Sequence, residues 1–361
     1  MASDSQAKEG TVLHKMLTSI SCKELLQYSQ NIRSTSSSAF APPEHPICFD
    51  SELTVQEACI ALAKHRISSA PIYSASEGGF VGMLDYSDLV AYVLAVLHKI
   101  PKAVNYDAEM DTSDIVKRAM TQGHTNVPVK LLANMSHHNP LVVVDASAPV
   151  LTAVEEFVRA KVHRVVILEK TSEGKPNFLG VLSQSSVAAY VASKFGKLSL
   201  DRLPESVWAT GSKTIAELNL VQGEVISVLP EDTVVEALHR MHQAKISSIA
   251  IIGKMTDRCD MWGSISMTDI KDVLGRRRGW SQLLQTTKTF FTSIRNAQAL
   301  ENSGRDAVPS FVVHPSTLLI TAVEKMTATH THRMWVVSSD AKTQTIVGVL
   351  TLSNVMPLLL S

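Results

Sequence analysis

A seven-residue pattern occurs four times in this chain of 361 residues. Each copy begins with glycine, continues with two residues of strand character and a small polar or acidic residue, and ends with a hydroxyl side chain followed by a polar residue. The copies occupy residues 82–88, 180–186, 263–269 and 348–354. Such a pattern indicates a strand, a turn and the N-terminus of a helix. Repetition constrains the fold more than any local motif, because each copy belongs to one structural unit of the same kind.

A second block precedes each copy in the same register. Apolar residues recur at helical spacing in the segments that begin at Val55, Leu151, Val234 and Leu319. Each predicted helix is followed by a short run of β-branched and large apolar residues, which is typical of a buried strand. A polar hairpin stretch comes next. Each unit is therefore predicted to contain strand, helix, strand, strand and helix, which gives an α/β fold class.

This layout resembles the CBS domain, the family named after cystathionine β-synthase. The four repeats are placed at residues 47–94, 141–193, 225–275 and 310–361. The other segments are an N-terminal tail, helix and loop (1–46), two linkers (95–140 and 194–224) and a linker helix (276–309). The resemblance implies that repeats one and two, and repeats three and four, pair into two modules. It further implies a disc of two modules with clefts for adenine nucleotides between repeats.

The composition excludes several classes of function. The chain is 45% hydrophobic and 19% charged, and its formal net charge is zero, which argues against a general attraction to nucleic acid or to an acidic membrane. Four scattered cysteines without a C-x-x-C spacing indicate reduced thiols, and the longest strongly apolar stretch (89–97) is too short to span a membrane. We expect a cytoplasmic protein that is also found in the nucleus. No catalytic motif is present, so we expect neither an enzyme nor a catalytic cofactor.

The repeated turns supply the first set of candidate ligand-binding residues. Hydroxyl groups can bond to ligand oxygens, a carboxylate can accept from both ribose hydroxyls, and a helix N-terminus donates to anions. By resemblance, Asp269 in repeat three would hold the ribose. The candidates are Ser266, Thr268, Asp269, Ser87, Asp88, Ser353 and Asn354. The alternative is that these side chains only cap helices, as such residues commonly do. In repeat one, Asp85 replaces the usual hydroxyl and would repel a nearby phosphate.

Two His-Arg pairs supply the second set. His163-Arg164 and His332-Arg333 occupy one column of the even repeats, where the odd repeats are aligned with Ile67-Ser68 and Ile246-Ser247. Arginine binds phosphate in a bidentate manner, and these pairs resemble the phosphate-contacting pairs of the AMP-activated kinase γ subunit. We predict that His163, Arg164, His332 and Arg333 contact the phosphate of AMP, ADP or ATP near the disc centre, and that Ser247 also belongs to the nucleotide site. Strand ends or an interface salt bridge are the alternative roles. Because Ser68 stands where the γ subunit has an arginine, at least one phosphate site should be weaker.

Two non-enzymatic functions fit this sequence. The preferred one is similar to the fungal four-CBS cell-cycle regulators that inhibit type 2A-like protein phosphatases under nutrient stress. This resemblance includes linker segments, such as residues 127–131, 139–140 and 300–309, as well as the repeats. The alternative is a nucleotide-sensing γ subunit of an AMP-activated protein kinase, favoured by the two His-Arg pairs. Expected partners are therefore adenine nucleotide and subunits of a protein phosphatase or a protein kinase.

Overall fold

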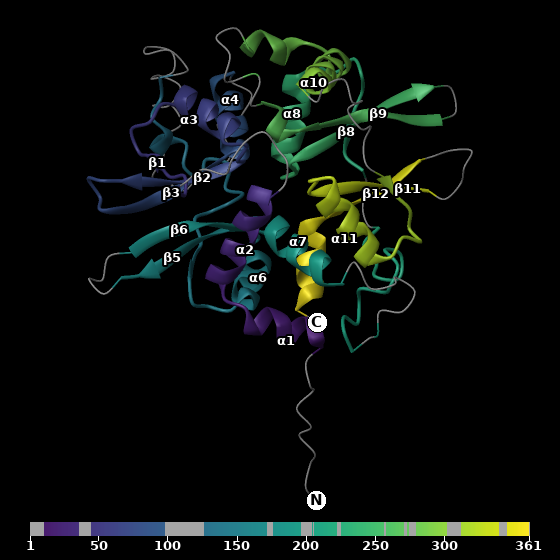
Figure 1. Cartoon of the computed structure of the whole chain (residues 1–361). Coiled ribbons are helices and arrows are strands. Elements are labelled where there is room, and N and C mark those ends of the chain that lie inside the picture. The colour runs from purple at the N-terminus through teal and green to yellow at the C-terminus, as the bar shows by residue number, and fades with distance from the viewer. Residues whose placement is uncertain are drawn as a thin grey trace, which may run out of the picture.

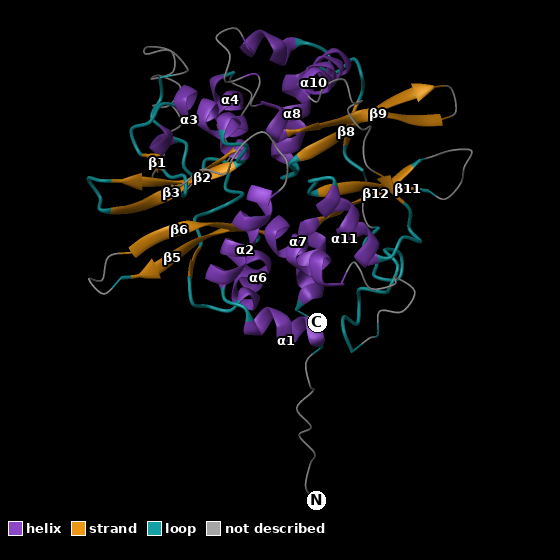
Figure 2. Ribbon diagram, viewed as in Figure 1, coloured by secondary structure: helices purple, strands orange, loops and turns teal. Residues whose placement is uncertain are grey.

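The computed structural model (Figures 1 and 2) describes residues 11–35, 45–97, 126–171, 176–195, 204, 206–221, 225–255, 258–270, 273, 279–301, 312–338 and 345–360. Within these residues lie four three-stranded sheets of identical topology. In each sheet the first strand pairs in parallel with the second, and the second pairs antiparallel with the third. Four α/β repeats of one kind are therefore present, as the sequence predicts.

The order of elements is strand, helix, strand, strand, helix. Repeat one contains β1 (Phe49–Asp50), α3 (Val55–Lys64), β2 (Ser69–Ser74), β3 (Gly79–Asp85) and α4 (Tyr86–Val96), and repeat two contains β4 (Val143–Asp145), α6 (Val150–Arg159), β5 (Arg164–Lys170), β6 (Pro176–Ser183) and α7 (Gln184–Phe195). Repeat three contains β7 (Ser227–Val228), α8 (Val234–Gln243), β8 (Ser248–Met255), β9 (Arg258–Ser266) and the 3₁₀ turn η3 (Met267–Ile270). Repeat four contains β10 (Val312–Val313), α11 (Leu319–Ala328), β11 (Arg333–Val337), β12 (Ile346–Thr351), α12 (Leu352–Val355) and η5 (Met356–Leu359).

The segments outside the repeats form further helices. The N-terminal segment has two, α1 (Val12–Ser19) and α2 (Cys22–Thr35), where the sequence predicts one. A 3₁₀ turn, η1 (Val129–Leu131), lies before repeat two. The predicted linker helix before repeat four consists of η4 (Gly279–Leu284) and α10 (Thr287–Glu301). No helix among the described residues is long and apolar enough to cross a membrane.

The turn after the first helix of each repeat fixes the alignment of the repeats. It contains a non-glycine residue with positive φ, a conformation that usually favours glycine at a helix C-terminus. These residues are Arg66, Lys161, Lys245 and His330, with φ of 51–53°. Each lies eleven residues after the first residue of the helix. The repeats therefore superpose when they are counted from the helix.

This alignment corrects one column of the sequence analysis. Arg164 pairs with Ser183 and Arg333 with Thr351, while Ser69 pairs with Asp85 and Ser248 with Ser266. The arginines thus share their column with Ser69 and Ser248. Ser68 and Ser247 fall one position earlier, in the column of the two histidines, so their predicted alignment with the arginines was wrong by one residue.

The repeated glycines lie at a β-bulge and under a covering segment. In all four repeats the register shifts next to the glycine's partner, and a Cβ on the glycine would meet a residue from outside the repeat. The residues in contact are Ala133 over Gly82, Leu26 over Gly180, Phe291 over Gly263 and Val221 over Gly348. The motif glycine therefore permits close approach of another chain segment to the strand.

These covering segments are exchanged within each module. An isolated bridge joins Ser21, which precedes repeat one, to Pro149 of repeat two, and Pro128, which precedes repeat two, bridges to Thr54 of repeat one. In the second module the corresponding bridges join Thr214 to Leu318 and Thr286 to Thr233. The segment leading into each repeat thus packs on the other repeat of its module. The two repeats of a module are interlocked, which supports the predicted pairing of one with two and three with four.

The hydrophobic cores run across the two modules. One core joins repeats one and three, where α4 contacts α8, and the other joins repeats two and four, where α7 contacts α11. The β2–β3 and β5–β6 hairpins lie side by side, and the β8–β9 and β11–β12 hairpins lie on the opposite side of the molecule (Figure 1). Phe80 and Phe178, whose ring centroids are 5.6 Å apart, join the first two hairpins. The four repeats therefore form a ring-like arrangement with helices between the modules.

Candidate functional site

The two His-Arg pairs come together between the even repeats. Each pair lies where the turn after the helix enters the strand, at the start of β5 and of β11. His163 lies within electrostatic reach of Arg333, and His332 lies within reach of both Arg164 and His163. We call His163, Arg164, His332 and Arg333 the central cluster. This proximity agrees with the sequence expectation that symmetry brings these residues together, and their contact with a phosphate stays a prediction.

Partial burial controls the charge of the central cluster. Burial, followed by the nearby guanidinium of Arg164, lowers the pKa of His163 to about 4. His332 has the same pKa of about 4 for the same two reasons, although its side chain remains accessible to solvent. Burial also lowers the pKa of Arg333 to about 10, against the opposing effect of Asp269. At neutral pH the cluster therefore holds two arginine cations and two neutral imidazoles, a combination suited to an anion.

Each arginine is oriented by a serine of the partner repeat. Arg164 Nη2 donates to Ser68 Oγ, and Arg333 Nη2 donates to Ser247 Oγ at 2.6 Å. Both bonds join the even repeat to the odd repeat of the same module, so the two bonds are equivalent by the pseudo-symmetry of the fold. Within the described part of the chain, each guanidinium uses one of its five N–H donors in a hydrogen bond to a side chain. Ser247 was predicted to bind the nucleotide, and in this structure it orients Arg333, another predicted nucleotide-binding residue.

The turns of repeats three and four cap their helices while staying near the surface. Asp269 Oδ2 accepts from the Ser266 amide at 2.8 Å, and Asn354 Oδ1 accepts from the Thr351 amide at 2.9 Å. Asp269 is half-buried. The exposed candidates in these two turns are Thr268, Ser353 and Asn354. Capping, the alternative role, is therefore present, and it coexists with access for a ligand.

Repeats two and four also meet directly through their turns. Ser353 Oγ donates to Gln184 Oε1 at 3.1 Å, and Gln184 Nε2 donates to the Val162 carbonyl at 3.1 Å. Gln184 is 5% exposed and lies next to the central cluster, because its amide bonds to the His163 carbonyl at 3.0 Å. The sequence analysis missed Gln184. It occupies a position of the turn motif that differs in every repeat, so no pattern marked it.

The turn of repeat one is buried under a linker loop that contains Ser136 and Asn139. Asp88 is 1% exposed and Ser87 is 6% exposed, and Asp88 Oδ1 accepts from the Ser136 amide at 2.9 Å and from the Ser136 hydroxyl at 2.7 Å. Asn139 donates to Asp85 Oδ2 and accepts from the His163 amide at 3.0 Å. The ligand role predicted for Ser87 and Asp88 would require this loop to move. Ser136 and Asn139 lie in a linker, where nothing in the sequence indicates their partners.

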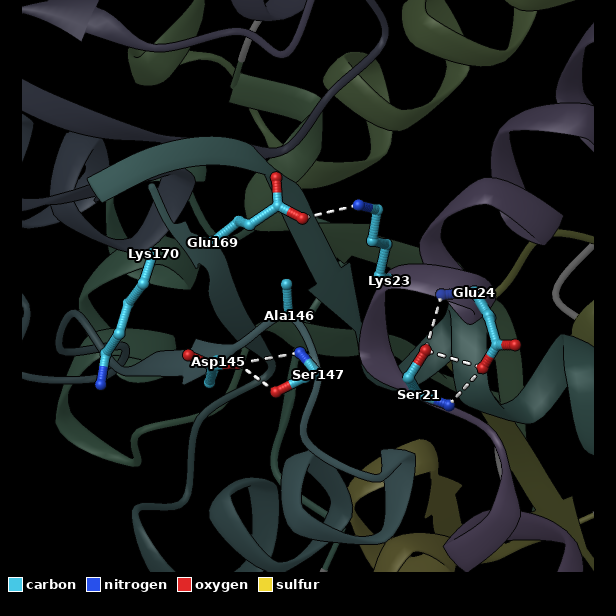
Figure 3. Close-up of a pocket in the computed structure, with 8 residues that line it drawn as sticks. All are labelled: Ser21, Lys23, Glu24, Asp145, Ala146, Ser147, Glu169 and Lys170. Carbon is cyan, nitrogen blue, oxygen red and sulfur yellow. Dashed lines mark hydrogen bonds and ion pairs between the residues drawn. The ribbon is translucent and has the colours of Figure 1, made fainter. Parts of the chain in front are cut away.

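A surface hollow of about 660 Å³ lies elsewhere, between α2 and the sheet of repeat two (Figure 3). Lys23 Nζ and Glu169 Oε1 form an ion pair of 2.6 Å across it. Its two serines are engaged in local turns, with Glu24 and Asp145 respectively. The lining residues are Ser21, Lys23, Glu24, Asp145, Ala146, Ser147, Glu169 and Lys170. None of the predicted ligand residues lines this hollow, and its charges are of both signs.

Comparison with known proteins identifies the family. The CBS domain family matches residues 42–95, 132–193, 216–276 and 306–361, which is more than half of the chain. The chain belongs to the CBS domain family. Among curated proteins, Protein SDS23 of Kluyveromyces lactis is 30% identical over 87% of this chain and 60% of its own length. Protein SDS24 of Saccharomyces cerevisiae is 31% identical over 84% of this chain and 56% of its own length. The chain thus spans about 60% or less of the length of these relatives.

A solved structure agrees with the fold. Protein MJ1225 from Methanocaldococcus jannaschii, whose description likens it to g-AMPK, superposes with a TM-score of 0.59 at 14% identity. The match covers 87% of this chain and 96% of that protein. At this identity the likeness concerns the fold, and it includes both modules. Across the described residues, no group of three or more histidine, cysteine, aspartate or glutamate side chains is arranged to hold a metal ion.

Proposed function

We propose that this chain is a non-enzymatic regulatory protein that binds an adenine nucleotide at the central cluster. The observation that carries the proposal is the meeting of Arg164 and Arg333 beside His163 and His332, at the contact of the two even repeats. Partly buried guanidinium groups attract a phosphate more strongly than exposed ones, because less water screens their charge. AMP, ADP and ATP all present such a phosphate.

The turn residues supply a place for the rest of the nucleotide. Thr268 is exposed and Asp269 is half-buried, and Asp269 lies within electrostatic reach of Arg333. A nucleotide whose phosphate lies at Arg333 could therefore place its ribose at Asp269, as the resemblance implies. On the fourth repeat, Ser353 and Asn354 are exposed beside the same cluster. The proposed ligand residues are the ten candidates outside repeat one.

We further propose that the output is control of a type 2A-like protein phosphatase in cell-cycle or nutrient-stress signalling. The support is the 30–31% identity to SDS23 and SDS24, two fungal proteins, over most of this chain. The linker segments, whose sequence resembles that of fungal four-CBS phosphatase regulators, support it further. We propose that the protein acts in the cytoplasm and also in the nucleus. A nucleotide changes affinity for a protein partner by favouring one of two states, with a coupling of about 1–3 kcal/mol.

A γ-type subunit of an AMP-activated protein kinase is the second candidate. The likeness of the whole disc to MJ1225 and the two symmetric His-Arg pairs favour it. Affinity capture from cell extract, with and without AMP, separates the two. Recovery of a type 2A-like phosphatase, in an amount that AMP changes, supports the first candidate. Recovery of kinase catalytic subunits without a phosphatase overturns it in favour of the second.

A further inference from the structure

In repeat one, another part of the chain occupies the place beside Asp88, the residue that corresponds to Asp269 in repeat three. Asp88 and Asp269 are equivalent, since each is the last residue of the repeated motif and bonds back to the first turn residue. Asp88 also accepts hydrogen bonds from a residue of the linker before repeat two. Ser136 gives both its amide and its hydroxyl to Asp88 Oδ1, at 2.9 and 2.7 Å. A hydroxyl bonded to this carboxylate is the contact that a ribose would make.

The loop that carries Ser136 is held in place on several sides. Leu132 and Met135 are buried in the core that joins repeats one and three, at 0% and 1% exposure. Ala133 lies so close to Gly82 that a Cβ there would be 2.7 Å away. Ser136 and Asn139 are themselves 5% and 6% exposed. The contact with Asp88 is therefore part of a packed interior.

Asn139 extends this closure to the central cluster. Its amide nitrogen donates to Asp85, and its oxygen accepts from the amide of His163 at 3.0 Å. One side chain thus joins the repeat-one turn to the residue that would contact a phosphate. Asp85 also lies within electrostatic reach of Asp88: burial, followed by the charge of Asp85, raises the pKa of Asp88, and the Asp85 carboxylate would repel an additional phosphate.

We propose that Ser136 and Asn139 occupy the repeat-one nucleotide position, so that this repeat takes no nucleotide and binding is confined to positions that do not use Asp88. The two residues would then determine which of the symmetry-related positions are available. This inference rests on the proposed nucleotide binding for its functional meaning. Its structural part, the closure of Asp88 by Ser136, stands separately.

The test is titration of the full chain with AMP by calorimetry. Asp88→Asn keeps the shape of the side chain, and we expect its affinity and stoichiometry to match those of the unmodified chain within about twofold. Asp269→Asn should weaken binding at least tenfold, because that position contacts the nucleotide. The double variant Ser136→Ala/Asn139→Ala should gain an additional binding event, and adding Asp88→Asn should remove that event.

A reduced stoichiometry, or a tenfold weaker affinity, in correctly folded Asp88→Asn would overturn the inference while leaving the proposed function intact. Absence of the additional event in the double variant would show that Ser136 and Asn139 do not determine occupancy. Amide hydrogen exchange provides a second measurement. We expect the Ser136 and His163 amides to be protected, and protection at Ser136 to remain unchanged at saturating AMP.

Two exchange results would overturn the closure: rapid exchange at Ser136 in the free chain, or loss of its protection when AMP binds. If AMP binds to no variant, the proposed function fails. The exchange measurement on the free chain then still decides whether Ser136 closes Asp88, since protection that disappears in Asp88→Ala supports the closure and its absence contradicts it.

Discussion

Arg333 of repeat four donates a hydrogen bond of 2.6 Å to Ser247 of repeat three, and Arg164 bonds to Ser68 in the same way across the first module. The serine holds the guanidinium at the contact between repeats. A side chain that is fixed before a ligand arrives loses less conformational freedom on binding. The role of Ser247 is then to orient Arg333.

Replacing Ser247 by alanine should release Arg333 and weaken AMP binding. A hydrogen bond to a charged group contributes about 1.5–3 kcal/mol, so we expect a loss of roughly 10- to 150-fold in affinity. Ser293→Ala is the control, because among the described residues Ser293 Oγ donates to the Phe290 carbonyl of its own helix, at 2.8 Å. Calorimetry gives both affinities. An unchanged affinity in Ser247→Ala would remove this orienting role.

Asp269→Ala should reduce both helix capping and nucleotide binding. The lost cap costs about 1 kcal/mol of stability, and the lost ribose contact about 1.5–3 kcal/mol of binding free energy. Asp232→Ala in the same repeat is matched, since Asp232 Oδ2 accepts a local bond from the Leu229 amide at 2.9 Å. We expect both variants to lose stability in urea and only Asp269→Ala to lose AMP affinity. Equal affinities would leave Asp269 with capping alone.

Stability should depend on pH through His163 and His332. The folded pKa of both is about 4, below the unfolded value of about 6.5. The unfolded chain therefore binds more protons in this interval, and stability that is complete above about pH 6.5 is lost as the pH falls toward 4. The double variant His163→Gln/His332→Gln should show a shallower loss, measured by urea unfolding at several pH values. His314→Gln, which lies outside the central cluster, is the control. An identical slope in the double variant would contradict this account.

Because a loop packs on Gly82 and no described residue packs on Gly79, alanine substitutions at these two positions of β3 should differ in their effect on stability. Gly82→Ala places a Cβ 2.7 Å from the Cβ of Ala133, whereas a Cβ on Gly79 meets nothing within 4 Å. Overpacking costs about 1–3 kcal/mol, so Gly82→Ala should unfold at lower urea concentration. Gly79→Ala should stay within about 0.5 kcal/mol of the unmodified chain. Similar effects of the two substitutions would show that the loop yields freely.

Sequence analysis predicted the repeated units because their pattern depends on local chemistry. The apolar spacing of Val55–Lys64 and of its three counterparts, and the turn that follows each second strand, are specified within a few residues. The exchanged covering segments could not be predicted in this way. They are held by short bridges such as Ser21 to Pro149, which join residues far apart in the chain and carry no pattern of their own.

The site was predicted in part for the same reason. Symmetry of the repeats was sufficient to bring His163 and His332 together. The strand pairing corrects the one-residue error at Ser68 and Ser247, because it places Ser69 and Ser248 in the column of the arginines. Spacing from the helix to the turn residue is constant and would have given the correct register. Closure of Asp88 depends on Ser136, a contact of 48 residues in sequence separation that no local pattern indicates.

Nucleotide binding through the central cluster is tested most directly by comparing AMP with adenosine in Arg333→Ala. Arg159→Ala serves as the charge-matched control, because its side chain is 73% exposed and pairs with Glu156 on the surface of α6. We predict that Arg333→Ala weakens AMP binding by about 10- to 100-fold, the scale of a charged hydrogen bond, and adenosine binding by less than about twofold. Equal losses for AMP and adenosine, or AMP affinity that matches that of Arg159→Ala, would contradict the assignment of the phosphate to this cluster.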